Sequence, residues 1–205
     1  GKRNSLFTTE GSIFKLRSKS KFYKKNINVL SIKKVEMKSI LLFRHGKSDW
    51  NANYKKDHDR PLSKRGVKAA KVMGLYLLNI QQIPDLIISS TALRAKTTAQ
   101  IAKKFGQWNS ELILDNNIYH CSIDQLLSIL SHQDTKLNFI CIVGHQPIFS
   151  HFLSEITDSN WVKLPTASMV RIDLPFKNWE ELKFGKGVLS WIKKPKELMP
   201  FKTTI

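Results

Sequence analysis

The sequence lacks the features that would assign the chain to a special structural class. Its 205 residues include two cysteines, nine glycines and seven prolines, too few for a disulfide-stabilised scaffold or a collagen-like chain. No apolar run approaches the roughly 18–20 residues that a membrane-spanning helix needs. Hydrophobic residues make up 41% of the chain and charged residues 24%, which is typical of a globular domain that buries its own core.

Acidic residues are also scarce. The chain has 34 Lys and Arg against 16 Asp and Glu, a formal net charge of +18. Such a surface attracts anions, which include phosphorylated substrates, nucleic acid, acidic proteins and anionic lipid. The charge alone does not choose among them.

The basic residues are concentrated at the start of the chain. Residues 1–36 carry ten Lys or Arg and two Glu, a net charge of +8, and show no clear periodicity. We therefore predict a basic N-terminal extension over 1–36 and a folded domain over 37–205. The extension has no apolar stretch of the length that a secretory signal requires. Together with the low cysteine content, this favours the reducing cytoplasm.

From residue 37 onward, short apolar runs alternate with amphipathic segments, which is typical of a mostly parallel sheet covered on both faces. Residues 168–174 alternate, residues 187–192 resemble a further strand, and the two are expected to pair as an antiparallel edge. The fold class predicted is three-layer α/β/α. Strands are predicted at 39–43, 86–88, 112–114, 139–143, 168–174 and 187–192, and helices at 63–80 (with Ser63 as N-cap), 92–105, 122–132 and 147–156.

Arginine and histidine side chains follow three of the predicted strands. Arg44 and His45 come after the first, Arg94 after the second and His145 after 139–143. In open α/β sheets, sites lie beyond the carboxyl ends of the strands, so these side chains should converge. One such histidine is more often structural, but four residues at three strand ends favour a phosphoryl site. Arginine binds phosphate oxygens with a planar fork, and nearby cations keep a histidine unprotonated and able to attack.

Five sequence blocks carry a resemblance to a known family. They are Arg44-His45-Gly46 with Ser48-x-Trp50-Asn51, Asp59-Arg60-Pro61-Leu62-Ser63-x-x-Gly66, Ser90-x-x-x-Arg94-Ala95-x-x-Thr98, Val143-Gly144-His145-Gln146-Pro147 and Pro165-Thr166-Ala167-Ser168. Their order and compact spacing, over about residues 38–195, resemble the histidine phosphatase superfamily. The later blocks are similar to its SixA-type phosphohistidine phosphatase branch. The resemblance implies a phosphoglycerate mutase-like fold.

The resemblance also implies roles for individual residues. His45 would be the nucleophile that becomes a transient phosphohistidine, and water would then release phosphate. The charge of the transferring group would be balanced by Arg44, Arg94 and His145. Substrate phosphate contacts would come from Ser48, Asn51 and Arg60. No metal is expected, because arginines supply the neutralisation that Mg²⁺ supplies in kinases, and no nucleotide-cofactor motif is present.

The chain departs from the larger branches of the family in two places. Lys47 stands where the mutase signature commonly has an acidic residue, which disfavours the mutase reaction. No clear equivalent exists for the glutamate that protonates an alkoxide leaving group. This favours P–N cleavage, because a protonated imidazole leaves as a neutral group, although His120 and Asp49 remain candidate acids.

Three functions are therefore compared. The leading hypothesis is a phosphatase that removes phosphate from phosphohistidine on a protein. A basic rim would accelerate the encounter of the enzyme with an acidic substrate protein. The second is a phosphatase for a small phosphomonoester with the same mechanism. The third is a basic nucleic-acid-binding module on a degenerate scaffold, which the intact set of two arginines and two histidines argues against. No membrane partner is expected.

Overall fold

The computed structural model describes residues 37–199, so the predicted extension, 1–36, lies outside the described residues. The strands are β1 (Lys38–Arg44), β2 (Leu86–Ser90), β3 (Glu111–Asp115), β4 (Phe139–Gly144), β5 (Met169–Leu174) and β6 (Val188–Lys193). The helices are α1 (Lys64–Asn79), α2 (Leu93–Phe105), α3 (Ile123–Ser131) and α4 (Ile148–Thr157), with 3-10 helices η1 (Asp57–Asp59), η2 (Asn116–Ile118), η3 (Trp179–Glu181) and η4 (Pro195–Glu197). Every predicted strand and helix is present, with bounds within two residues of those expected. No helix in 37–199 is long and apolar enough to cross a membrane.

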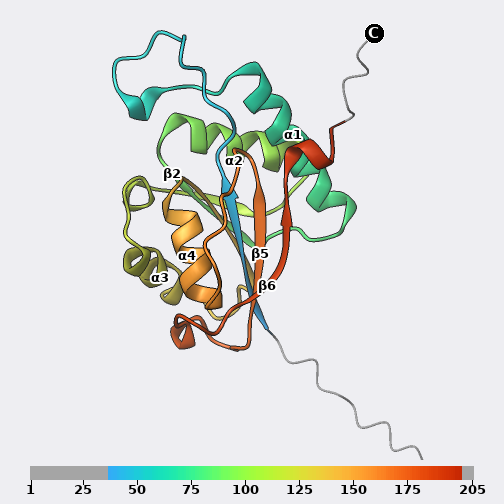
Figure 1. The fold of residues 1–205 in the computed structure, drawn as a ribbon. Coiled ribbons are helices and arrows are strands. Elements are labelled where there is room, and N and C mark those ends of the chain that lie inside the picture. The colour runs from blue at the N-terminus through green and yellow to red at the C-terminus, as the bar shows by residue number, and fades with distance from the viewer. Residues whose placement is uncertain (1–36, 200–205) are drawn as a thin grey trace, which may run out of the picture. The chain divides into compact units, whose positions relative to one another are not determined.

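The six strands form one sheet in the order β3-β2-β4-β1-β5-β6 (Figure 1). The pairs β3–β2, β2–β4 and β4–β1 are parallel, while β1–β5 and β5–β6 are antiparallel. The predicted α/β fold is confirmed, and so is the antiparallel edge, because β5 and β6 pair antiparallel and β6 is the edge strand. β5 is the strand that runs against the others, since β6 reverses direction again.

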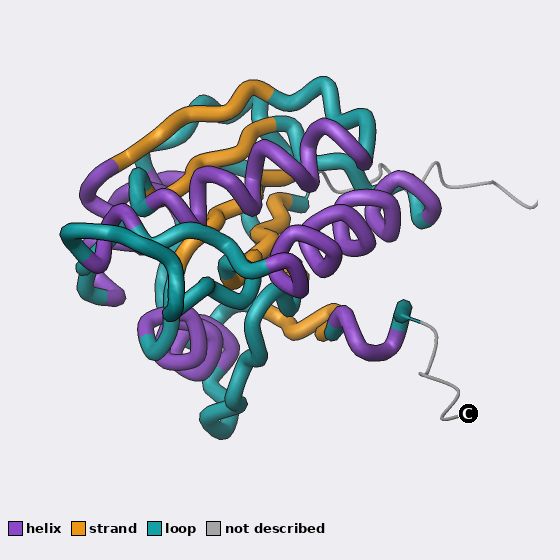
Figure 2. The backbone as a smooth tube through the Cα atoms, turned by 90° about the horizontal axis from the view of Figure 1, so that it is seen from above, coloured by secondary structure: helices purple, strands orange, loops and turns teal. Residues whose placement is uncertain are grey.

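Helices cover both faces of the sheet (Figure 2). Alternate residues of a strand point to opposite faces, and β1 separates its side chains accordingly. Ile40 and Leu42 pack in a core with residues of α3 and α4. Leu41 and Phe43 pack in a second core with residues of α1 and α2. All four are fully buried, because the strand lies between two helical layers.

The start of α1 is fixed to the loop that follows β1. The predicted N-cap is confirmed, since Ser63 Oγ accepts a hydrogen bond from the Gly66 amide at 3.1 Å. The same hydroxyl donates to the Lys47 carbonyl at 3.0 Å. A Cβ on Gly66 would lie 2.2 Å from that carbonyl oxygen, so only glycine allows this approach. The loop after β1 is therefore held against the helix.

Candidate active site

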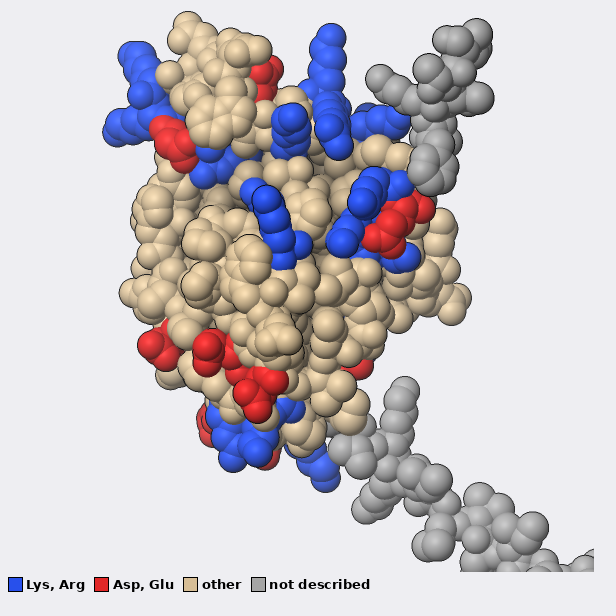
Figure 3. Space-filling view, viewed as in Figure 1, with Lys and Arg blue, Asp and Glu red and all other residues tan. Residues whose placement is uncertain are grey.

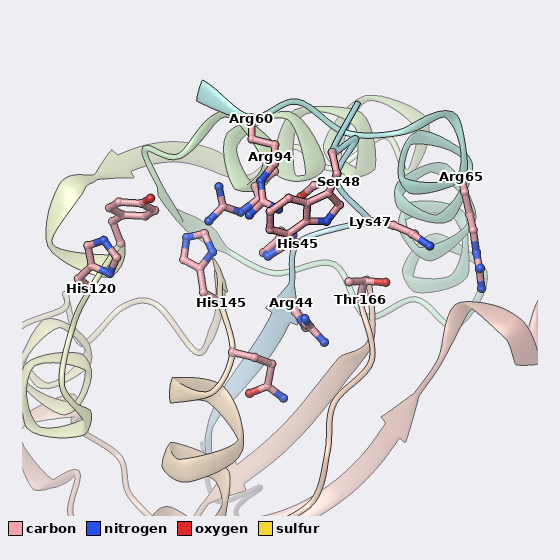
Figure 4. Close-up of a pocket in the computed structure, with 13 residues that line it drawn as sticks. Arg44, His45, Lys47, Ser48, Arg60, Arg65, Arg94, His120, His145 and Thr166 are labelled. Atoms are coloured by element: carbon pink, nitrogen blue, oxygen red, sulfur yellow. The ribbon is translucent and has the colours of Figure 1, made fainter. Parts of the chain in front are cut away.

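A cavity of about 550 Å³ opens beyond the carboxyl ends of β1, β2 and β4 (Figure 4). It is strongly cationic, because five of its lining residues are Arg or Lys and none is Asp or Glu. Six of the seven predicted site residues line it. The lining consists of Arg44, His45, Lys47, Ser48, Trp50, Arg60, Arg65, Arg94, Tyr119, His120, His145, Gln146 and Thr166.

The backbone and ring of His45 are both held in place. Its amide donates to the Gly144 carbonyl at 3.0 Å, and its carbonyl accepts from the Ala167 amide at 3.0 Å. Its ring Nδ1 lies 2.7 Å from the Gly46 carbonyl oxygen. A carbonyl oxygen can only accept, so Nδ1 carries the proton. The neutral ring therefore keeps a free electron pair on Nε2, which is the requirement for a nucleophile.

The environment of His45 disfavours its charged form. The side chain is 8% exposed. Burial, together with the nearby guanidinium groups of Arg94, Arg44 and Arg60, lowers the pKa of His45 to about 4, despite the opposing hydrogen bond to Gly46. The ring is thus uncharged at neutral pH, with its proton on Nδ1 and none on Nε2.

The second predicted histidine lies beside the first. The ring centroids of His145 and His45 are 5.1 Å apart. His145 Nε2 lies 2.9 Å from Ser90 Oγ, and its Nδ1 has no hydrogen-bond partner among the described residues. Burial, followed by the charges of His45 and Arg94, lowers the pKa of His145 to about 2.

Three arginines of the cavity are fixed by hydrogen bonds or ion pairs from their terminal Nη atoms. Arg44 donates from Nη1 to the Leu164 carbonyl at 2.6 Å. Arg94 donates to the Asp57 carbonyl at 2.7 Å and to its carboxylate at 2.9 Å, and Arg60 Nη2 lies 2.8 Å from the other carboxylate oxygen. The Nε–H group of each arginine is buried without a partner in 37–199. The guanidinium groups that line the cavity therefore keep hydrogen-bonding capacity that the described residues do not use.

Sequence reasoning missed the group that holds two of these arginines. Asp57, in η1, contacts both Arg60 and Arg94, and its carboxylate also accepts a 2.8 Å hydrogen bond from the Tyr119 hydroxyl. Partial burial acts to raise the pKa of Asp57, but the Tyr119 hydrogen bond and both guanidinium groups lower it overall. Burial and the bond to Asp57 raise the pKa of Tyr119.

The remaining predicted residues divide into those that line the cavity and those that do not. Ser48 is buried and lines the cavity. Asn51 is exposed and is not among the lining residues. Its backbone N–H group donates to the Asp49 carboxylate at 3.0 Å. Of the two candidate acids, His120 lines the cavity and Asp49 does not. The structure therefore does not bring Asn51 to the site, and its phosphate contact stays a prediction.

Ten of the thirteen lining residues lie within residues 40–126, the segment that matches a family model. Residues 40–126 match the histidine phosphatase superfamily, branch 1. The chain is similar to this superfamily over that segment, which is less than half of its length. Among the described residues, no group of three or more His, Cys, Asp or Glu is arranged to hold a metal ion.

Individual proteins are also similar to this chain. An uncharacterized chloroplastic protein of Arabidopsis thaliana is 27% identical over 161 residues, which cover 74% of this chain and 73% of the relative. The structure of the protein histidine phosphatase SixA complexed with tungstate superposes with a TM-score of 0.69 at 18% identity, covering 78% of this chain and 99% of that one. Mycobacterial glucosyl-3-phosphoglycerate phosphatase gives a TM-score of 0.56 at 15% identity, covering 75% and 97%. At these identities the two structures establish a shared fold.

Proposed function

We propose that the chain is a phosphatase that hydrolyses phosphohistidine on a protein substrate through a covalent phospho-His45 intermediate. The observation that carries this proposal is the state of His45. Its Nδ1 is occupied by the Gly46 carbonyl, its Nε2 is left with a free electron pair, and its neighbours are three guanidinium groups and a second neutral histidine.

In the first step, His45 Nε2 forms a bond to phosphorus while the bond from phosphorus to the substrate imidazole breaks. The leaving imidazole takes the electron pair of that bond and departs neutral if its other nitrogen is protonated. The phosphoryl oxygens accept hydrogen bonds from Arg44, Arg94 and Arg60. Donors already oriented toward the developing charge stabilise the transition state without reorganisation.

In the second step, a water molecule attacks phospho-His45. The new oxygen–phosphorus bond replaces the Nε2–phosphorus bond, and the electron pair of the broken bond returns to His45 Nε2. Both protons of the water leave with the released phosphate. The Gly46 carbonyl keeps the proton on Nδ1 throughout, so the ring returns to the same tautomer. His145 remains neutral beside the reacting group and contacts it without adding charge.

The lining of the cavity supports a phosphoramidate substrate over an ester. No carboxylic acid lines it, and Asp57 is ionised between two arginines, which makes it a poor proton donor. An alkoxide leaving group needs such a donor. A protonated imidazole does not, because it already carries its proton.

A small phosphomonoester is the second candidate. It is favoured by the fold shared with glucosyl-3-phosphoglycerate phosphatase and by His120 and the Tyr119 hydroxyl at the cavity wall. Either group could protonate an alkoxide. The chemistry at His45 would be unchanged.

The test measures phosphate release from a phosphohistidine-bearing protein and from an aryl phosphate, with the native chain and with His45→Ala. We expect release from phosphohistidine that falls by at least about 10³-fold in the variant, since loss of a nucleophile removes the covalent route. The phosphoenzyme should be trapped on the native chain alone, in alkaline quench, where phosphohistidine survives. The matched control is His132→Ala, an exposed histidine at the end of α3, which should leave the rate unchanged.

The outcomes separate the candidates. Release from the aryl ester alone would favour the small-molecule phosphatase. Absence of release from both, combined with salt-dependent DNA binding that survives His45→Ala, would favour a binding module and overturn the catalytic proposal.

A further inference from the structure

A second cavity adjoins the first. It has a volume of about 480 Å³ and lies between the start of α1, the segment before β5 and η4. Three residues, Lys47, Arg65 and Thr166, line both cavities. In Figure 4 these three lie on the side of the first cavity opposite His120. The second cavity, here called the η4 groove, is therefore an extension of the phosphoryl site in one direction.

The η4 groove combines an apolar floor with a cationic rim. The floor contains Ala69, Pro165, Pro195 and Met199, and the rim contains Lys47, Arg65, Lys194 and Lys196. Figure 3 shows Lys and Arg side chains gathered over this end of the molecule, where the 46–62 loop and η4 lie.

The single acidic residue of the groove does not neutralise its rim. Glu197 Oε2 lies 3.1 Å from Lys193 Nζ, and its Oε1 accepts a hydrogen bond from the Lys194 amide at 3.1 Å. Its charge is thus balanced by Lys193, which is not a lining residue. The four rim cations remain available to a ligand.

We propose that the η4 groove binds an acidic, partly apolar segment of the phosphorylated protein substrate, next to the phosphohistidine that enters the first cavity. The inference rests on the proposed function and adds the chemistry of the substrate surface to it. Rim cations would pair with Asp or Glu side chains, and the floor would bury an apolar side chain between them. Such complementarity sets specificity and association rate.

The lining of the groove disfavours two other occupants. None of its residues is aromatic, so it offers no platform on which the bases of a single-stranded nucleic acid could stack. Residues 200–205 of the chain itself contain one lysine and no acidic residue. A segment of that charge is not complementary to four cations.

The test is a pair of charge-reversed variants. Lys194→Glu with Lys196→Glu alters residues that line the groove but not the first cavity. Lys183→Glu with Lys186→Glu gives the same change of net charge on exposed residues just before β6, at the opposite end of the sheet. Each is assayed with an acidic phosphohistidine-bearing protein and with free phosphohistidine, at low and high salt.

For the groove variant, we expect KM for the acidic protein to rise about 10-fold at low salt. The rise should shrink at high salt, while kcat and the rate with free phosphohistidine stay unchanged. The control variant should retain native KM values. An unchanged KM in the groove variant, or an equal rise in the control, would overturn the proposal. Lys196→Glu alone, a change of one exposed side chain, replaces the double variant if melting shows that the latter is unfolded.

A direct binding measurement separates this proposal from the proposed function. If the native chain releases no phosphate from any phosphohistidine, the proposed function fails, and a fluorescein-labelled peptide of acidic and apolar residues is used instead. Weaker fluorescence-anisotropy binding of this peptide to the groove variant than to the control supports the groove. Equal binding to both, or displacement of the peptide by an oligonucleotide, overturns it.

Discussion

The two ends of the central sheet both bury polar and charged side chains, but only one end supplies each of them with a partner. At the amino end, Lys38 is 1% exposed, and its ammonium group donates to the Thr135 carbonyl and to Asn138 Oδ1. Ser39, also buried at this end, donates to Asp173 Oδ1 at 2.8 Å. At the carboxyl end, buried nitrogen atoms lack partners. Within 37–199, all buried side-chain nitrogen and oxygen atoms without a partner belong to Arg44, Arg60, Arg94 and His145.

This difference separates the part of the molecule that stabilises the fold from the part that serves the proposed chemistry. A buried polar group without a hydrogen bond costs about 1–3 kcal/mol. The amino end avoids this cost, whereas the carboxyl end keeps donors that an anionic substrate could use. We therefore expect substitutions at the amino end to lower stability and substitutions at the carboxyl end to lower activity.

The strongest test of this difference replaces one arginine at each end of the sheet with lysine. Arg94→Lys keeps the positive charge but loses the planar guanidinium group, which Asp57 holds at the wall of the cavity. The proposed reaction predicts a fall in kcat/KM of about 10²–10³-fold, the usual effect of losing an oriented donor in the transition state. Steady-state phosphate release from a phosphohistidine-bearing protein measures it.

The matched control is Arg171→Lys in β5. The Arg171 guanidinium group donates to Asp173, Gln82 and Ser39, all away from the cavity. Its replacement should lower the free energy of unfolding by about 1 kcal/mol and leave kcat/KM unchanged. Equal activity losses in the two variants would contradict the division between the ends.

The pH dependence of stability provides a second comparison. Histidine in the unfolded chain has a pKa near 6.5, whereas burial and neighbouring arginines lower the pKa of His45 to about 4 in the folded state. Below about pH 6.5 the unfolded state therefore binds more protons, and acid destabilises the fold. The contribution of His45 is fully present above pH 6.5 and is lost as pH falls toward 4. It amounts to about 3 kcal/mol.

Denaturant melts at a series of pH values between 7 and 4 test this expectation. The free energy of unfolding of the native chain should fall more steeply with acid than that of His45→Ala, which lacks the group. Parallel pH profiles for the two proteins would show that His45 titrates normally in the folded state. Phosphate release should persist down to about pH 5, because the ring remains unprotonated there.

The sequence predicted the elements and the convergence of the main side chains. Alternating apolar runs locate the strands because each face of the sheet is covered by helices. Arg44, His45, Arg94 and His145 could be placed together because parallel strands end at one edge. The antiparallel pairing of β5 with β6 was also predicted, whereas the order of the strands was not, since apolar alternation indicates a strand without giving its neighbours.

The missed residues lie in loops, where no periodicity places a side chain. Asp57 stands in the charged stretch 55–59, where it resembles a solvated residue. Its contact with Arg94 spans 37 positions in the chain and depends on the path of the 46–62 loop. Asn51 was placed by resemblance alone, and the same loop carries it away from the cavity. A carboxylate three residues before Arg60, at helical spacing, was the available signal for Asp57.

A further prediction concerns the end of the sheet that has no catalytic role in the proposed function. Lys38→Ala removes a buried side chain whose ammonium group donates to the Thr135 carbonyl and to the Asn138 side chain. Loss of hydrogen bonds to a charged group should lower the free energy of unfolding by about 2 kcal/mol, while kcat/KM of the folded protein stays at the native value. Denaturant melts and initial rates on the same preparation measure both quantities. A loss of activity without a loss of stability would mean that the buried lysine acts on the distant site, because the site contains no group that contacts it.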